Sequence, residues 1–193
     1  MTHHQYISLE KIETATNDLL RAIGEDPARE GLKGTPKRVA RAWAELTSGY
    51  GEKPEEVLGT VFSPEGYDQV VALRDVPFVS LCEHHLLPFH GEVDIAYLPG
   101  KHVVGISKLA RIVQTYARRL QIQERMTAQI AEAIHTILKP KGVVVRVVGE
   151  HSCMRMRGTK VLGSSMVTSD VRGTFRTKAA ARAEVFALFD REG

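Results

Sequence analysis

The sequence predicts an α+β protein: an antiparallel four-stranded sheet with two helices on one face, preceded by N-terminal helices. Residues 1–66 show helical periodicity and then a connection rich in Gly, Pro and Glu. Strand-like patterns begin near Gln69 and occur as two pairs, with a pair of helical patterns between them. Paired strands separated by paired helices are typical of an antiparallel sheet with its helices on one face. The chain therefore divides into an N-terminal helical region, 1–66, and a second domain, 67–193.

The N-terminal region is predicted to contain two helices. The first covers 8–23, where apolar residues recur at helical spacing, with serine at its start as the N-cap and Gly24 as the stop. The second begins at Thr35 and Pro36, because threonine is a capping residue and proline suits the first helical turn. We expect this helix to end at Gly49.

Four segments are predicted to be strands. Val70–Leu81 is rich in β-forming residues, and Pro77 within it indicates the edge of a sheet or a bulge. Gly91–Leu98 alternates apolar and polar residues, as a strand with one buried face does. Val143–Val148 is a β-branched run, and Lys160–Thr168 is a weaker strand candidate.

Helices are predicted between the strand pairs and at the end of the chain. Ser107 can cap the first of them, and Lys178–Phe189 closes the chain. The apolar stripes that define the two middle helices are Leu109, Ile112, Val113, Tyr116 and Leu120 in one, and Ile122, Met126, Ile130, Ile134 and Ile137 in the other.

Composition excludes several classes of protein. The chain of 193 residues has a net charge of +3 and no long basic run, so we expect no nucleic-acid partner. No apolar stretch approaches the roughly 18 residues of a membrane span. The N-terminus lacks the pattern of a signal peptide, and the two cysteines are flanked by histidines. These features predict a cytoplasmic protein with reduced thiols.

Cys82, His85 and Cys153 predict a metal site. A Cys-x-x-His spacing lets a thiolate and an imidazole reach one ion from a single turn. A second thiolate from elsewhere makes three soft ligands, which suits zinc and leaves a fourth position for water, as in a catalytic site. The alternative for the cysteines is that both are buried and inert.

His84 and His151 lie beside the predicted ligands and are suited to proton transfer, because histidine titrates near neutrality. For His84 the alternative is a hydrogen bond to a metal ligand. Either histidine, or Glu83, could also be a fourth ligand, and a closed set of four would make the zinc structural.

An extended chain beyond Val148 would place His151, Cys153, Arg155 and Arg157 on one face, because side chains alternate along a strand. A histidine would then lie two residues from the third ligand, with two arginines beyond it. The prediction requires that the backbone stays extended through this segment.

Several short motifs occur together in one order. They are Thr35-Pro36-Lys37-Arg38, Cys82-Glu83-His84-His85, Gly105-Ile106-Ser107-Lys108-Leu109, Gln123-Glu124-Arg125, His151-Ser152-Cys153, Arg157-Gly158, Thr168-Ser169 and Gly173-Thr174-Phe175. Together they resemble GTP cyclohydrolase I over nearly the whole chain. The resemblance implies conversion of GTP and water to 7,8-dihydroneopterin triphosphate and formate, the entry step to folate and other pterins.

The resemblance also implies an architecture and an assembly. Members have the tunnelling fold, an antiparallel sheet with two helices on one side, and form a homodecamer of two stacked pentamers with active sites at subunit boundaries. In this chain, one Zn²⁺ per subunit would be held by Cys82, His85 and Cys153.

Catalytic and guanine-binding roles follow from the same resemblance. His151 and His84 would move protons, and Ser107 would lie near the ribose. Glu124 would accept hydrogen bonds from guanine N1–H and the 2-amino group, supported by Gln123. Without the resemblance, Glu124 is a carboxylate favoured at a helix N-terminus.

The triphosphate requires cations, and five side chains are candidates: Lys108, Arg111, Arg157, Arg38 and Arg41. Lys108 and Arg111 are three residues apart on one helix and can face the same way. The other interpretation of Arg38 and Arg41 is that they form the solvated face of an amphipathic helix.

Two other classes of protein remain as alternatives. A zinc deaminase would need a Pro-Cys-x-x-Cys signature as well as a His-x-Glu, and the chain has no Pro-Cys-x-x-Cys. A non-catalytic module that binds pterins or purines would keep the fold without turnover.

Overall fold

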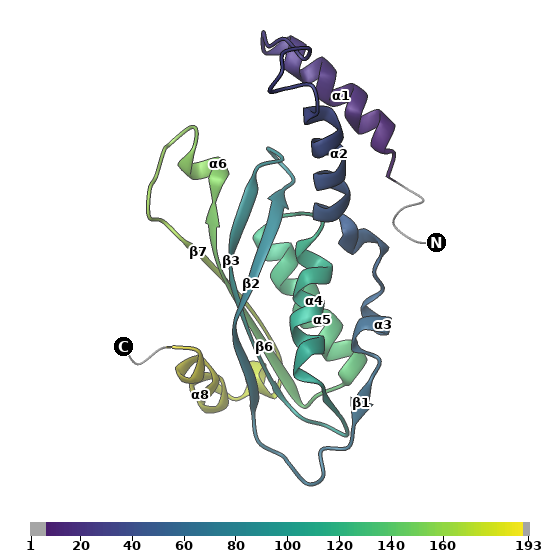
Figure 1. Ribbon diagram of the computed structural model, residues 1–193. Helices are drawn as coiled ribbons and strands as arrows, with labels where there is room; N and C mark the ends of the chain where they lie inside the picture. The colour runs from purple at the N-terminus through teal and green to yellow at the C-terminus, as the bar shows by residue number, and fades with distance from the viewer. Residues whose placement is uncertain (1–6, 191–193) are drawn as a thin grey trace.

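The computed structural model describes residues 7–190, and helices begin and end it (Figure 1). The first helix, α1, covers Leu9–Ala22. Ser8 is its N-cap, with the side-chain oxygen accepting a hydrogen bond from the Lys11 amide at 3.3 Å. Gly24, just beyond the helix, has a φ of +86°, which favours glycine. The predicted start and stop of this helix are both confirmed.

The second helix, α2, covers Thr35–Leu46 and differs from the prediction at both ends. Gly34 is the N-cap, so Thr35 is the first helical residue and caps nothing through its side chain. Gly49 lies in a 3₁₀ turn, Ser48–Gly51, beyond the helix. A Cβ at Gly49 would be 2.2 Å from the Thr115 carbonyl oxygen, so the glycine is required for close approach to the next layer.

The segment predicted to be a connection contains short elements. They are helix α3, Pro54–Leu58, and strand β1, Val61–Phe62, which pairs with β4, Val103–Val104. Leu58 is fully buried in the main core, so α3 attaches this segment to the sheet domain. The Gly and Pro residues of this segment predicted a break in regular structure. The burial of Leu58 depends on contacts with distant parts of the chain, which the local sequence does not reveal.

The central sheet has the order β5-β2-β3-β6-β7 within the described chain. The strands are β2, Val71–Cys82; β3, Pro88–Leu98; β5, Leu120–Gln121; β6, Gly142–His151; and β7, Met166–Gly173. The four long strands pair antiparallel, as predicted. The short β5 adds a parallel pairing, so the sheet is mixed rather than purely antiparallel.

Pro77 lies at the edge of the sheet. β5 pairs only with Leu81 and Cys82, so β2 has no second neighbour in the sheet at Pro77 among the described residues. The register with β3 shifts between Leu73 and Val76. A proline costs no ladder hydrogen bond at such a position, which confirms the prediction of an edge.

The predicted strand Lys160–Thr168 is wrong over most of its length. β7 begins only at Met166 and continues to Gly173, paired with β6. The preceding residues form a loop in which Gly158 and Gly163 have positive φ. Val161 and Leu162 of this loop are exposed, and their apolar side chains led to the incorrect prediction of a strand.

Two helices cover one face of the sheet (Figure 1). They are α4, Ile106–Ala117, and α5, Gln123–Leu138, and their apolar stripes form the main core with β2, β3 and β6. Gly105 is the N-cap of α4, so Ser107 lies inside the first turn and is not the cap. Short helix α6, Ser152–Arg155, follows β6.

The opposite face of the sheet carries the C-terminal helices. α7, Thr174–Thr177, leads into α8, Ala179–Phe189, close to the predicted helix. Phe175, Val185 and Phe189 pack on that face in a second, smaller core. Among the helices described, none is long and apolar enough to cross a bilayer.

Candidate active site

The turn after β2 brings the first two predicted ligands together. The Cys82 amide donates to the Leu87 carbonyl at 2.9 Å, and the Leu86 amide donates to the Cys82 carbonyl at 2.8 Å. This tight turn leaves His85 Nδ1 4.0 Å from Cys82 Sγ. A Cys-x-x-His sequence therefore presents a sulfur and an imidazole on the same side of the chain.

Cys153 reaches the same place from the short helix α6, which follows β6. One ligand atom each of Cys82, His85 and Cys153 lies within 4.8 Å of the others. Cys82 is buried, Cys153 is half-buried and His85 is exposed. Two sulfurs and one nitrogen are a donor set for zinc or another borderline or soft cation, so the group is consistent with a metal site.

Burial and the nearby sulfur of Cys82 both affect the pKa of the Cys153 thiol. Burial raises the pKa of the Cys153 thiol, and the adjacent Cys82 raises it further. A bound cation would have the opposite effect, because it stabilises thiolate ligands. Metal binding and ionisation of these cysteines are therefore coupled.

The three remaining candidates for a fourth ligand do not belong to the group found within residues 7–190. Glu83 forms an ion pair with Arg125 at the start of α5. His151 Nε2 lies 2.9 Å from Gln123 Oε1. His84 is exposed, with Nδ1 3.9 Å from Cys82 Sγ. Among the described residues, the group therefore has three protein donors, one from each of Cys82, His85 and Cys153.

The expected alternation along the strand after Val148 fails. β6 ends at His151, and residues 152–155 form the helical turn α6. Cys153 reaches the group from this turn, and Arg155 pairs with Glu150 instead of lying beside the ligand. The prediction was wrong because a helical turn replaces the extended backbone on which it depended.

His151 is held on two sides. Its ring stacks on Phe89, with centroids 4.6 Å apart and an interplanar angle of 5°. Burial lowers the pKa of His151, and the Glu124 carboxylate opposes this shift. Glu124 itself is exposed, so His151 and Glu124 form a partly open pair beside the metal group.

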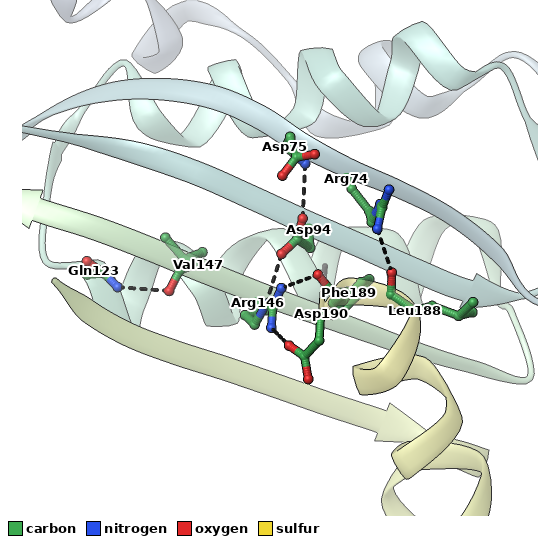
Figure 2. Close-up of polar contacts among 9 residues, drawn as sticks. All are labelled: Arg74, Asp75, Asp94, Gln123, Arg146, Val147, Leu188, Phe189 and Asp190. Atoms are coloured by element: carbon green, nitrogen blue, oxygen red, sulfur yellow. Dashed lines mark hydrogen bonds and ion pairs between the residues drawn. The ribbon is translucent and has the colours of Figure 1, made fainter. Parts of the chain in front are cut away.

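Gln123 is buried at the start of α5, which its sequence does not indicate. Its Nε2 donates to the carbonyl oxygens of Val147, at 3.1 Å, and Met166, at 2.8 Å. Figure 2 shows the first of these bonds. The family resemblance implied that Gln123 supports the guanine edge, and nothing in the sequence indicated its contact with His151, which joins residues far apart in the chain.

Arg157 is the one predicted phosphate ligand that the structure places beside the metal group. Its Nη1 donates to His85 Nε2 at 2.8 Å, and the side chain is otherwise exposed. The Arg157 guanidinium therefore lies against His85, one of the three residues of the metal group.

Ser107, Lys108 and Arg111 lie elsewhere. They occupy the start of α4, where Ser107 lines a shallow pocket with Leu73–Pro77. The strand from Pro77 to Cys82 is about 16 Å long at roughly 3.3 Å per residue. Within one chain, these side chains and the metal group are at different ends of β2.

Arg38 and Arg41 form a third location on the exposed side of α2. Arg38 Nη2 donates to Thr35 Oγ1 at 2.9 Å and more weakly to the Gly31 carbonyl. Neither arginine approaches the metal group through any contact within its own chain that the structure describes. The predicted site residues thus fall into three separate groups in one subunit.

Comparison with known proteins assigns the family. The family model described as GTP cyclohydrolase I matches residues 12–190. The chain is 51% identical over 187 residues to GTP cyclohydrolase 1 of Carboxydothermus hydrogenoformans, covering 96% of this chain and 97% of that protein.

Two further relatives agree. Identity is 54% over 179 residues to GTP cyclohydrolase 1 of Pelotomaculum thermopropionicum (92% and 95% covered) and 51% over 187 residues to that of Bacillus subtilis (96% and 98% covered). An apo structure of archaeosine synthase QueF-Like is only weakly similar, with a TM-score of 0.45 and 20% identity over 55% of this chain and 96% of that one. On the family match and the sequence identities, the chain belongs to the GTP cyclohydrolase I family.

Proposed function

We propose that the protein is a zinc-dependent GTP cyclohydrolase I, which converts GTP and water to 7,8-dihydroneopterin triphosphate and formate. The observation that carries the proposal is the convergence of Cys82, His85 and Cys153 beside His151, in a chain that belongs to this family. The reaction is the first step of folate and tetrahydropterin synthesis, and the enzyme would work in the cytoplasm.

Cys82, His85 and Cys153 would hold one Zn²⁺ per subunit. Zinc in a site of three protein ligands acts as a Lewis acid and lowers the pKa of a water molecule to about 7. Three donor residues and no fourth among the described residues support this assignment, because a catalytic site keeps one position free of protein ligands.

His151 and His84 would move protons during opening of the guanine ring. His151 is restrained by Phe89 and Gln123, so its ring can be presented in one orientation. His84 is exposed on the turn that carries two of the ligands. Ser107 would contact the ribose from the start of α4.

Glu124 would recognise guanine. Guanine presents two adjacent donors, N1–H and the 2-amino group, and a carboxylate has two acceptor oxygens to match them. The Glu124 side chain is exposed and close enough to His151 to affect its pKa. Adenine lacks this pair of donors, so the carboxylate gives specificity. Gln123 would support the same edge indirectly, because its buried amide faces the sheet and His151.

The triphosphate would be bound by Lys108, Arg111, Arg157, Arg38 and Arg41. Only Arg157 lies beside the metal group in its own chain. The separation of the others supports a site completed by neighbouring subunits, and hence a homodecamer of two stacked pentamers. We also propose that the chain divides into a helical region, 1–66, and a catalytic domain with the tunnelling fold, 67–193.

Incubation of zinc-loaded protein with GTP tests the proposal. We expect equimolar formate and a product that becomes a fluorescent pterin on oxidation. GTP bound without turnover would instead indicate a binding module, and ammonia in place of formate would indicate a deaminase. Either result, with stoichiometric zinc present, would refute the proposed reaction.

A further inference from the structure

Gln123 links the sheet to His151 through a series of hydrogen bonds. In each of these bonds, only one of the two atoms can be the donor. Gln123 Nε2 lies within hydrogen-bonding distance of the Val147 and Met166 carbonyl oxygens. Carbonyl oxygens only accept, so the amide NH₂ group of Gln123 must face them. The Gln123 oxygen Oε1 is therefore the atom that faces His151 Nε2, 2.9 Å away.

Two threonines agree with this direction. Thr127 Oγ1 donates its one hydrogen to the Gln123 backbone carbonyl at 2.7 Å. Thr168 Oγ1, 2.7 Å from Thr127 Oγ1, must then be the donor in that contact. Its lone pair remains to accept from Gln123 Nε2 at 3.2 Å. Each of these hydrogens therefore has an acceptor. If the Gln123 amide were flipped, its Oε1 would face the Val147 and Met166 carbonyl oxygens with no hydrogen between them.

The same amide is fixed by packing. Gln123 is 1% exposed, and a Cβ at Gly149 would lie 2.4 Å from its Oε1. Glycine on β6 thus leaves the space through which the glutamine reaches His151. Phe89 stacks on the other side of the imidazole and limits its rotation.

We propose that Gln123 is a positioning residue that holds neutral His151 in the Nε2–H tautomer, leaving Nδ1 as its reactive nitrogen. An amide oxygen cannot donate, so the proton between the two side chains belongs to Nε2. A proton that His151 takes up enters at Nδ1 and leaves from Nδ1, while Nε2–H stays bonded to Gln123. This assignment rests on the proposed function only for the statement that His151 transfers protons.

The tautomer can be observed directly in the wild-type holoenzyme. In ¹⁵N-labelled, zinc-loaded protein, the two ring nitrogens of neutral His151 have different chemical shifts according to which of them carries hydrogen. His151→Gln removes the signals and so assigns them. We expect Nε2 to be protonated and Nδ1 to be unprotonated. The reverse pattern, or an even mixture, overturns the proposal without any assay of turnover.

Gln123→Met gives the kinetic test, because methionine keeps the length of the side chain and removes the acceptor. We expect kcat to fall about 10-fold or more, within the roughly 10²- to 10⁴-fold that general acid–base catalysis contributes. The KM for GTP should change little, since the amide is buried. A rise in KM with kcat unchanged would mean that Gln123 binds guanine and would refute the positioning role.

Gln121→Met is the matched control. Gln121 is also buried, and its Nε2 donates to the Tyr116 carbonyl and to Gln129 at the same end of the sheet. Within residues 7–190 it makes no hydrogen bond to His151, so its substitution should lower stability while leaving kcat near wild type. If Gln123→Met does not fold, the wild-type tautomer decides the question. If wild-type protein releases no formate, the proposed function fails, whereas the tautomer assignment is tested independently.

Discussion

Cys82 and Cys153 are the two cysteines of the chain, and burial together with the nearby Cys82 raises the pKa of the Cys153 thiol. A thiolate at Cys153 is disfavoured beside a second sulfur, since two adjacent negative charges would repel each other. A dication bound by both, together with His85, removes that penalty. At the scale of single residues, the metal and the two sulfurs therefore depend on each other.

Cys153→Ser should abolish metal retention. Serine is a poor zinc ligand, so the bound metal should fall well below one ion per chain after dialysis. Formate production should drop by more than about 100-fold, because losing an outer partner of a metal ligand already costs about 10- to 100-fold. Ser152→Ala is the control in the same helical turn, and it should keep both zinc and turnover. Full activity in Cys153→Ser would contradict the ligand assignment.

His151 should make stability depend on pH. Burial lowers its pKa below the ordinary value of 6.5, so the folded protein binds this proton more weakly than the unfolded chain does. As pH falls through 6.5 the unfolded state gains the proton first, and stability from the neutral ring is lost toward the lower folded pKa.

Denaturant titrations at several pH values can measure this effect. With a chelator present, so that metal release does not contribute, wild type should lose more unfolding free energy on acidification than His151→Gln. Equal slopes for the two proteins, or a larger loss in the variant, would show that the ring is not buried in its neutral form.

At the scale of elements, a bulged strand and the C-terminal helix are tied together through one arginine (Figure 2). Arg146 on β6 donates to Asp94 Oδ2 at 2.9 Å, to Asp190 Oδ1 at 2.6 Å and to the Phe189 carbonyl at 2.7 Å. The other oxygen of Asp94 accepts from the Asp75 amide at 3.0 Å, where β2 and β3 shift register. Asp94 is 4% exposed, and Arg146 is the cation that pairs with its buried carboxylate.

Arg146→Met should lower the free energy of unfolding by about 3 kcal/mol, the lower end of the cost of leaving a buried charge unpaired. Chemical denaturation measures this change. Arg74→Met is the control, because Arg74 makes a single bond to the Leu188 carbonyl from an exposed position and should cost about 1 kcal/mol or less. Zinc content should be unaffected in both, and a loss as small as the control's would show that Asp94 finds another partner.

Elements with local signals were predictable from sequence, and elements fixed by distant contacts were not. Ser8 marks the start of α1 through a bond to a residue three positions away. By contrast, β7 begins where Met166 pairs with Gly149, and no local pattern specifies that register. The helical turn after His151 likewise replaced an expected strand.

The candidate site divides in the same way. Spacing around Cys82 and His85 predicted their convergence because one tight turn produces it. The contact between Gln123 and His151 could not be predicted, since it depends on the junction of α5 with β6 and β7. A polar residue that the sequence suggests as a ligand-binding residue can instead form its hydrogen bonds within the protein, as Gln123 does.

At the scale of the whole molecule, the residues of the proposed site lie in three separate places within a single chain. The metal group is at the end of β2, the cations Lys108 and Arg111 are at the start of α4, and Arg38 is on a helix pair beyond the sheet (Figure 1). We expect a site shared between subunits to bring the separated groups together.

Complementation between two inactive variants tests whether sites are shared. Cys153→Ser removes a proposed metal ligand, and Arg111→Ala removes a proposed phosphate ligand, so each homo-oligomer should be inactive or nearly so. In mixed oligomers assembled by co-expression, some sites combine the intact metal group of one chain with the intact arginine of another. Random assembly at equal amounts should restore about a quarter of wild-type activity, because two chains must each be of the right kind. A site contained in one chain would give no recovery, because every chain in the mixture carries a defect.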